Sequence, residues 1–234
     1  MTIARALQRF AGRPVGAIAL GLSLGLCVAT LAQAQTAAPA APAAPAAPTA
    51  AAPVVASTPD GLVRQISLEV IGTVKSDKAI QAGDINKIMA LVDAKILPNV
   101  NFVRMTASAV GRYWRQATPD QQKRLQEEFK HLLVRTYSGA LTQVKDQVVE
   151  FKPMRSRPED TEVVVRTEIR GSGEPIQLDY RLEKAGNAWK IYDVNVLGVW
   201  LVENYRSSFA QEISASGIEG LITKLAAKNK ASKS

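Results

Sequence analysis

The sequence predicts an α+β fold in which several helices cover one face of a curved antiparallel sheet of about four strands. Three observations carry this prediction. Apolar residues recur at helical spacing from about residue 59 to 136, the hydrophobic period changes to two between about 161 and 196, and helical spacing returns after Gly198. A run of helices followed by a run of strands is typical of an α+β domain rather than of alternating βαβ units.

The N-terminus predicts export. Residues 1–34 contain three arginines and no acid, followed by an apolar run at 15–31 and a small-residue cleavage pattern that ends at Ala34. This pattern is typical of a secretory signal peptide cleaved after Ala34. Cleavage would remove the only cysteine, Cys27, which excludes a cysteine nucleophile and thiolate metal ligands from the mature protein.

The remaining chain divides into a linker, one domain and a short tail. Residues 35–57 repeat alanine and proline without charge, and the regular prolines predict an extended spacer. Residues 58–228 suffice for a single domain with a sizeable core, and residues 229–234 form a basic tail. Loss of the three arginines of residues 1–34 lowers the formal net charge from +8 to +5, and this basic balance points to anionic surfaces or acidic protein partners.

Capping residues predict where the helices begin. Thr58-Pro59-Asp60 begins a helix over about 59–75, and Asp84 begins a second that Pro98 ends. A third helix begins near Phe102 and continues through the sequence GRYWRQ at 111–116. On a helical wheel Tyr113 and Trp114 share its apolar side and are expected in the core, with the arginines facing water.

A tight corner follows the third helix. Thr118-Pro119-Asp120-Gln121 predicts an N-cap, a proline at the first helical position and a capping-box glutamine, which together open a long fourth helix. His131, the only histidine, is expected to be an exposed residue on the polar side of this helix. After Gly198, helical spacing predicts a further helix to Ile213 and a short last helix to Leu225.

Alternation predicts the sheet. Strands are expected at about 144–152, 161–170 and 175–184, and a last strand places Trp189 and Ile191 inward. Val194 and Val196 have the opposite parity to Ile191, so a bulge near Asp193 would restore them to the same face and bend the sheet.

Motifs for catalysis are absent from the sequence. No phosphate-binding glycine loop, dinucleotide fingerprint or G-x-S-x-G elbow occurs. One histidine makes a tight transition-metal site improbable, so neither catalytic nor metal-binding residues are assigned. Asp193, beside Trp189 and Tyr192, is the one carboxylate that a pocket enzyme could use for proton transfer. Aromatic residues on buried faces argue against nucleic-acid binding.

Three separated blocks of sequence carry a family resemblance. The chain resembles the MlaC family of periplasmic phospholipid carriers, also called toluene-tolerance proteins, from about Asp60 to Leu225. The blocks are GRYW at 111–114 before ATP at 117–119, VRT at 165–167 with DYRL at 179–182, and WKIYDV at 189–194 with NYR at 204–206 and Phe209. One departure is visible: Leu197 and Trp200 stand where relatives usually have glutamate and serine.

The resemblance implies a periplasmic carrier with a cone-like fold and an apolar cavity. It implies a monomer that shuttles phospholipid between an outer-membrane lipoprotein complex and an inner-membrane ABC transporter complex, which maintains the lipid asymmetry of the outer membrane. Phospholipid would be cargo, and no cofactor is expected. The residues expected to line the cavity are the inward apolar side chains of the strands and of the third helix: Met105, Ala109, Val163, Val165, Ile169, Ile176, Leu178, Tyr180, Trp189, Ile191, Val194 and Val196.

Two other function classes remain open from the sequence. One is an enzyme that uses Asp193 in a cone-shaped pocket, and the other is a periplasmic adapter whose core is filled by its own side chains. Apolar alternation is the same in a filled and in a hollow domain, so the sequence does not distinguish the carrier from the adapter.

Overall fold

The computed structural model describes residues 58–157, 159–171 and 173–231. The predicted signal peptide at 1–34 and the predicted linker to residue 57 therefore lie outside the described residues. The helical segments are α2 (Pro59–Ser76), α3 (Lys78–Gln81), α4 (Ile85–Leu91), the π-helical turn η1 (Val92–Ile96), the 3-10 turn η2 (Leu97–Asn99), α5 (Phe102–Val110), the 3-10 segment η3 (Gly111–Gln116), α6 (Pro119–Leu141) and α7 (Leu201–Ala231).

The sheet is antiparallel throughout and its strands follow chain order. They are β1 (Val148–Phe151), β2 (Glu162–Arg170), β3 (Ile176–Ala185), β4 (Ala188–Val196) and β5 (Val199–Trp200), paired in the order β1-β2-β3-β4-β5. The α+β prediction is confirmed. The short strand β5 was not predicted, because its two residues also continue the helical spacing of α7.

The predicted bulge is present in β4. Arg181 pairs with Asp193, whereas the next residue of β3, Leu182, pairs with Ile191, so Tyr192 is an additional residue on β4. The bulge returns Val194 to the face that carries Ile191, and Asp193 lies on the other face.

Local capping explains where the helices begin. The Thr118 hydroxyl accepts a hydrogen bond from the amide of Gln121 at 3.2 Å, and the Gln121 side chain accepts one from the amide of Thr118 at 3.1 Å. The predicted capping box is therefore confirmed. Thr58 likewise accepts a hydrogen bond from the amide of Gly61 at 3.2 Å at the start of α2.

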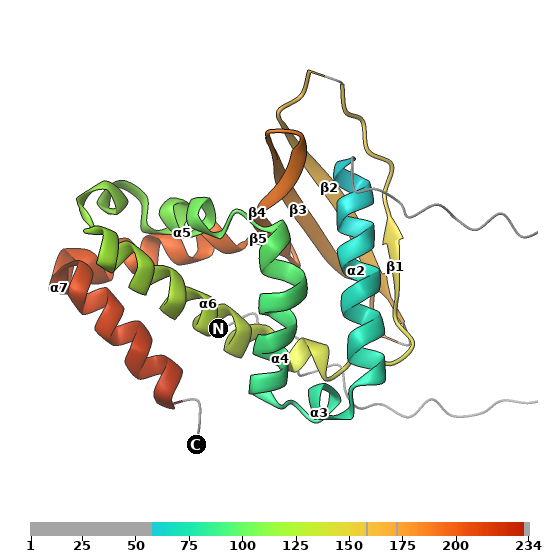
Figure 1. Cartoon of the computed structure of the whole chain (residues 1–234), viewed down its shortest axis with the longest axis horizontal. Coiled ribbons are helices and arrows are strands. Elements are labelled where there is room, and N and C mark those ends of the chain that lie inside the picture. The colour runs from blue at the N-terminus through green and yellow to red at the C-terminus, as the bar shows by residue number, and fades with distance from the viewer. Residues whose placement is uncertain (1–57, 158, 172, 232–234) are drawn as a thin grey trace, which may run out of the picture. The chain divides into compact units, whose positions relative to one another are not determined.

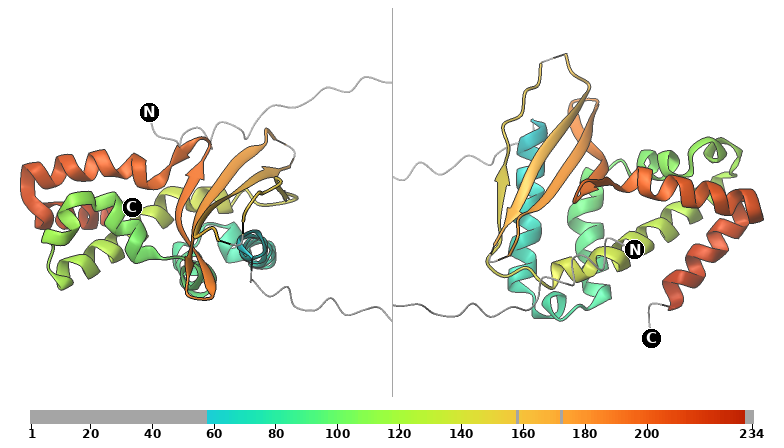
Figure 2. Two further views of the ribbon diagram at one scale, coloured as in Figure 1. Left: turned by 90° about the horizontal axis from the view of Figure 1, so that it is seen from above. Right: turned by 180° about the vertical axis from the view of Figure 1, so that it is seen from behind.

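The helices form two groups around the sheet (Figures 1 and 2). Helix α2 lies along one face of the sheet, where Leu62 and Val63 pack with Val165, Leu182 and Ile191. Helices α5, α6 and α7 pack together beyond β4, and the fully buried Phe129 is the centre of their core. Its ring centroid lies 5.9 Å from that of Phe102, 5.1 Å from that of Tyr205 and 5.3 Å from that of Phe209.

Segment η3 differs from the prediction of one continuous third helix. Helix α5 ends at Val110 because Gly111 has a φ of 65°, and the chain then forms a 3-10 turn. The change of direction leaves Tyr113 and Trp114 half-buried against the helical core instead of within it. The prediction that these two rings belong to the core was wrong for this reason.

Helix α7 is bent at Gly217, where φ is 73° and ψ is 178°. The C-terminal arm continues to Ala231, and the buried Asn229 donates hydrogen bonds to the backbone and side chain of Glu128 on α6. Among the described residues, none of the helices has the length and apolar character needed to cross a bilayer.

Substitution of Gly217 by alanine tests the bend. We expect Gly217→Ala to lower the free energy of unfolding by about 1 to 3 kcal/mol, because the observed φ and ψ are strained for any residue with a Cβ. Gly139→Ala is the matched control, since Gly139 lies in α6 with no atom within 4 Å of a built Cβ, and it should raise the free energy of unfolding by about 0.5 to 1 kcal/mol. Urea denaturation measures both, and similar values for the two variants would contradict a required bend.

Candidate functional site

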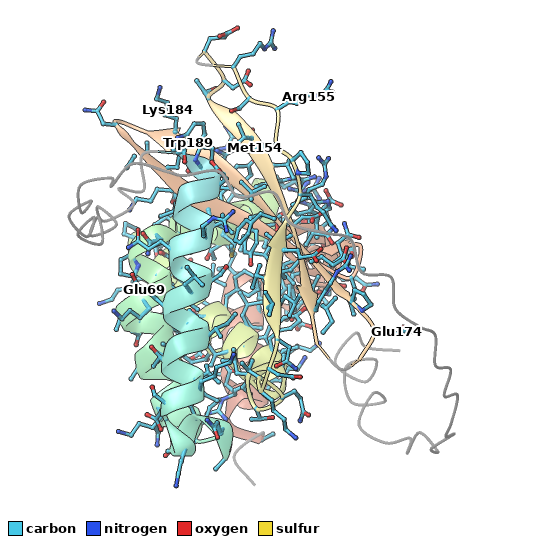
Figure 3. The ribbon with its side chains drawn as sticks, turned by 90° about the vertical axis from the view of Figure 1, so that its right-hand side faces the viewer. Glu69, Met154, Arg155, Glu174, Lys184 and Trp189 are labelled. Atoms are coloured by element: carbon cyan, nitrogen blue, oxygen red, sulfur yellow. The ribbon has the colours of Figure 1, made fainter. Side chains whose placement is uncertain are left out.

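The strand residues predicted to line a cavity share one face of the sheet. Cross-strand pairs join Val165 to Tyr180 and Tyr180 to Val194, and the same alternation holds along each strand. This inner face is the one against which α2 packs, and Figure 3 shows α2 alongside the strands with Trp189 and Met154 near one end of the helix. The structure therefore brings the predicted residues of β2, β3 and β4 together.

Met105 and Ala109 lie in a different cluster. Both are buried on α5 in the core of the α5–α6–α7 group. Val194 packs against that core and against the cluster under α2, so it links the two groups of helices. The structure thus places the two α5 residues beside the strand face rather than on it.

Most side chains of the inner face are only partly buried. Of the predicted strand residues, Val165, Ile191 and Val196 are buried, and the others are half-buried. Helical side chains packed against the apolar clusters are also only half-buried, namely Ile66, Val70, Leu133 and Tyr205. The described apolar residues fall into three separate clusters instead of one continuous core. This arrangement leaves apolar surface for an apolar ligand.

Burial raises the pKa values of three tyrosines. Burial raises the pKa of Tyr180 to about 12, although hydrogen bonds with Ser67 and Thr167 oppose the shift. Burial also raises the pKa of Tyr137 to about 12 and, by a smaller amount, the pKa of Tyr205. All three rings are half-buried, and the protein atoms packed around them are the cause of the raised pKa values. Sequence reasoning identified Tyr180 and missed Tyr137 and Tyr205, whose helical spacing is that of ordinary core residues.

Asp193 has a structural position. It is 1 % exposed on the outer face of the sheet, where its carboxylate accepts hydrogen bonds from the amides of Val194 at 2.9 Å and Val202 at 3.1 Å. Arg181 donates to its other oxygen at 3.1 Å. Burial raises the pKa of Asp193, and the two amides and Arg181 oppose that shift. The carboxylate therefore caps the first turn of α7 from a neighbouring strand and does not face the apolar inner face.

Three further residues singled out by the sequence are Trp200, Leu197 and His131. Trp200, one of the departures from the family pattern, covers Arg181 with the guanidinium carbon 3.8 Å from its ring centroid. Leu197, the other departure, has a φ of 52° in the turn between β4 and β5 and is 37 % exposed. His131 is half-buried on α6, so the prediction that it is exposed was wrong. Among the residues that the structure describes, there is no cluster of histidine, cysteine and acidic side chains able to hold a metal ion.

The side chain of Asp179 was not singled out by the sequence. It is 5 % exposed on the outer face, and Gln177 donates to one carboxylate oxygen at 2.7 Å. The other oxygen has no hydrogen-bond partner. Strand alternation alone predicts that Asp179 is exposed to solvent, whereas the structure buries it on the outer face of the sheet.

Comparisons with known proteins agree with this geometry. A family model described as MlaC protein matches residues 64–227. Toluene tolerance protein ttg2D of Pseudomonas putida is 27% identical over 70% of this chain and 77% of that protein. The intermembrane phospholipid transport system binding protein MlaC of Haemophilus influenzae is 23% identical over 74% of this chain and 82% of that protein.

A solved structure gives the same fold. A phospholipid-binding protein from Ralstonia solanacearum, in complex with a phospholipid, is 44% identical, with a TM-score of 0.73 over 75% of this chain and 98% of that chain. The family model covers well over half of the sequence, and its span includes α3 to β5 and most of α2 and α7. This chain is therefore a member of the MlaC family.

Proposed function

We propose that this protein is a periplasmic phospholipid carrier. The observation that carries the proposal is the apolar inner face of β2, β3 and β4 opposite α2, most of whose side chains are only half-buried. The complex of the Ralstonia solanacearum protein with a phospholipid supports the same class of ligand.

The acyl chains are proposed to lie against the inner face. The proposed contact residues are Val163, Val165, Ile169, Ile176, Leu178, Tyr180, Trp189, Ile191, Val194 and Val196, with Met105 and Ala109 behind them. Two acyl chains of about 16 carbons lose roughly 25 kcal/mol on exposure to water, at about 0.8 kcal/mol per CH2. Such a lipid needs a container to cross an aqueous compartment. The charged headgroup remains at the mouth of the site because burying it would cost too much.

The proposed activity is binding without catalysis. Asp193, the candidate acid of the enzyme alternative, is occupied by two backbone amides and by Arg181. Transport between an outer-membrane lipoprotein complex and an inner-membrane ABC transporter complex then requires that those partners supply the energy. We propose that a monomeric lipid-binding domain begins at residue 58 and includes α7 to Ala231, that the linker at 35–57 precedes it, and that cleavage after Ala34 releases the protein into the periplasm.

Co-purification tests the cargo. We expect the protein, exported in a bacterium and purified without detergent, to carry diacyl phospholipid, because its tails recover their transfer free energy on the inner face. Native mass spectrometry and organic extraction detect the lipid. Protein that is lipid-free and takes no lipid from liposomes would favour the adapter.

Filling the inner face should evict the lipid. Leu178 is half-buried on that face and pairs with Val196, so Leu178→Trp should lower lipid occupancy by about tenfold, the equivalent of about 1.4 kcal/mol. Leu68→Trp is the matched control, because Leu68 is 64% exposed on α2, and it should retain lipid. The proposal is contradicted if folded Leu178→Trp protein retains lipid as fully as Leu68→Trp.

Two substitutions of Asp193 separate capping from catalysis. Asp193→Asn should still bind phospholipid, because an amide oxygen can accept from the amide of Val202. Asp193→Ala should lower the free energy of unfolding by about 1 to 2 kcal/mol through loss of the cap. Burial raises the pKa of Asp193, so its ionisation weakens the fold as the pH rises through that pKa, and Asp193→Asn should remove this part of the pH dependence. Thermal unfolding and lipid extraction measure these effects, and loss of lipid from folded Asp193→Asn protein would point to a role in the site.

A further inference from the structure

A groove lies between η3, α5 and the first arm of α7, on a surface that the proposed lipid site does not use. Its volume is about 1050 Å³. Helices α5 and α7 lie side by side in Figures 1 and 2, and Arg206 of α7 donates to the backbone oxygen of Ser108 on α5 at 3.0 Å. The Tyr113 hydroxyl lies 2.9 Å from that of Ser214, which ties η3 to α7.

The lining of this groove combines basic and apolar side chains. The charged residues in its lining are all arginines, Arg104, Arg112, Arg115 and Arg206, and no acidic residue is among them. Its apolar lining comes from Ala107, Val110, Trp114 and Ala210.

Three of the four guanidiniums have no carboxylate partner among the described residues. Arg104 is the exception and pairs with Glu162 and Glu183. Arg112 donates to the Tyr113 hydroxyl at 2.9 Å, and Arg206 bonds only to a backbone oxygen. Arg115 is exposed, without a hydrogen bond or ion pair in the described part of the chain. Elsewhere in the described chain Arg124, Arg157, Arg170 and Arg181 are paired with acids, whereas the scattered Arg64, Arg135, Arg155 and Arg166 are not.

From this geometry we propose that the groove docks an acidic, partly apolar segment of a partner protein. Guanidinium groups bind carboxylates with two parallel hydrogen bonds, and unpaired arginines have no internal pair to break first. The apolar lining supplies a floor for an aliphatic anchor, which is the arrangement expected of a segment bound in a helical groove. A flat bilayer would reach the rim of such a groove and leave the floor empty. A protein segment is therefore favoured over an anionic membrane.

Docking here leaves the cargo in place. Met105 and Ala109 on α5 are buried in the helical core, whereas Ala107 and Ser108 of the same helix line the groove. A partner would thus contact the back of the helix. The lipid content of a groove variant reports on the carrier proposal separately from docking.

The test is a charge reversal with a matched control. The probe is a short fluorescein-labelled peptide that alternates glutamate with leucine, and its counterpart has lysine in place of glutamate. Binding to the full chain is measured by fluorescence anisotropy at low and high salt. The groove variant is Arg112→Glu with Arg115→Glu. The control is Lys78→Glu with Lys87→Glu, which makes the same change of charge at exposed residues of α3 and α4.

We expect the acidic peptide to bind the wild type, the groove variant to bind about tenfold or more weakly, and the control to bind within about twofold of the wild type. Salt should weaken binding, and the lysine peptide should not bind. Both variants should fold and carry as much phospholipid as the wild type. Absence of binding, or an equal loss in both variants, would overturn the proposal. It would also be overturned if phosphatidylglycerol vesicles bind through these arginines while the peptide does not.

Discussion

The bulge in β4 is the constraint on which the inner face depends. Without the bulge, Tyr192 would pair as a regular strand residue, and the alternation that places Ile191 inward would turn Val194 and Val196 to the outer face and bring Asp193 inside. The bulge therefore keeps the inner face of β4 apolar on both sides of Tyr192. The same bulge holds Asp193 where its carboxylate caps α7, so the position of that helix and the chemistry of the inner face have a common origin.

The apolar residues of this domain form separate clusters, which distinguishes it from an ordinary α+β domain with one continuous core. Helix α2 closes over part of the inner face, and the α5–α6–α7 group has its own core around Phe129. Val194 contacts both. A carrier needs this division, because each cluster can hold its elements in place while apolar surface between them stays available to acyl chains. Tyr180 on this face has a pKa raised to about 12 by the protein atoms packed around it.

Sequence reasoning succeeded where the cause was local. The capping box at Thr118 and the change of parity before Val194 each depend on a few neighbouring residues, and both were predicted. It failed where distant segments decide the outcome. Gly111 turns the chain so that Trp114 lines a groove, and the other wall of that groove is α7, about a hundred residues later. Whether Leu178 faces side chains or a hollow depends on how α2 and α6 are placed, which alternation does not encode.

Photo-crosslinking of the bound lipid tests the account most directly. A phospholipid with a diazirine in one acyl chain is loaded into the protein, activated by light and mapped by peptide mass spectrometry. The account predicts adducts on the inward residues of β3 and β4, among them Leu178, Tyr180 and Val194. Adducts confined to the outer face of the sheet, or to the groove between η3 and α7, would contradict the claim that the covered inner face holds the acyl chains.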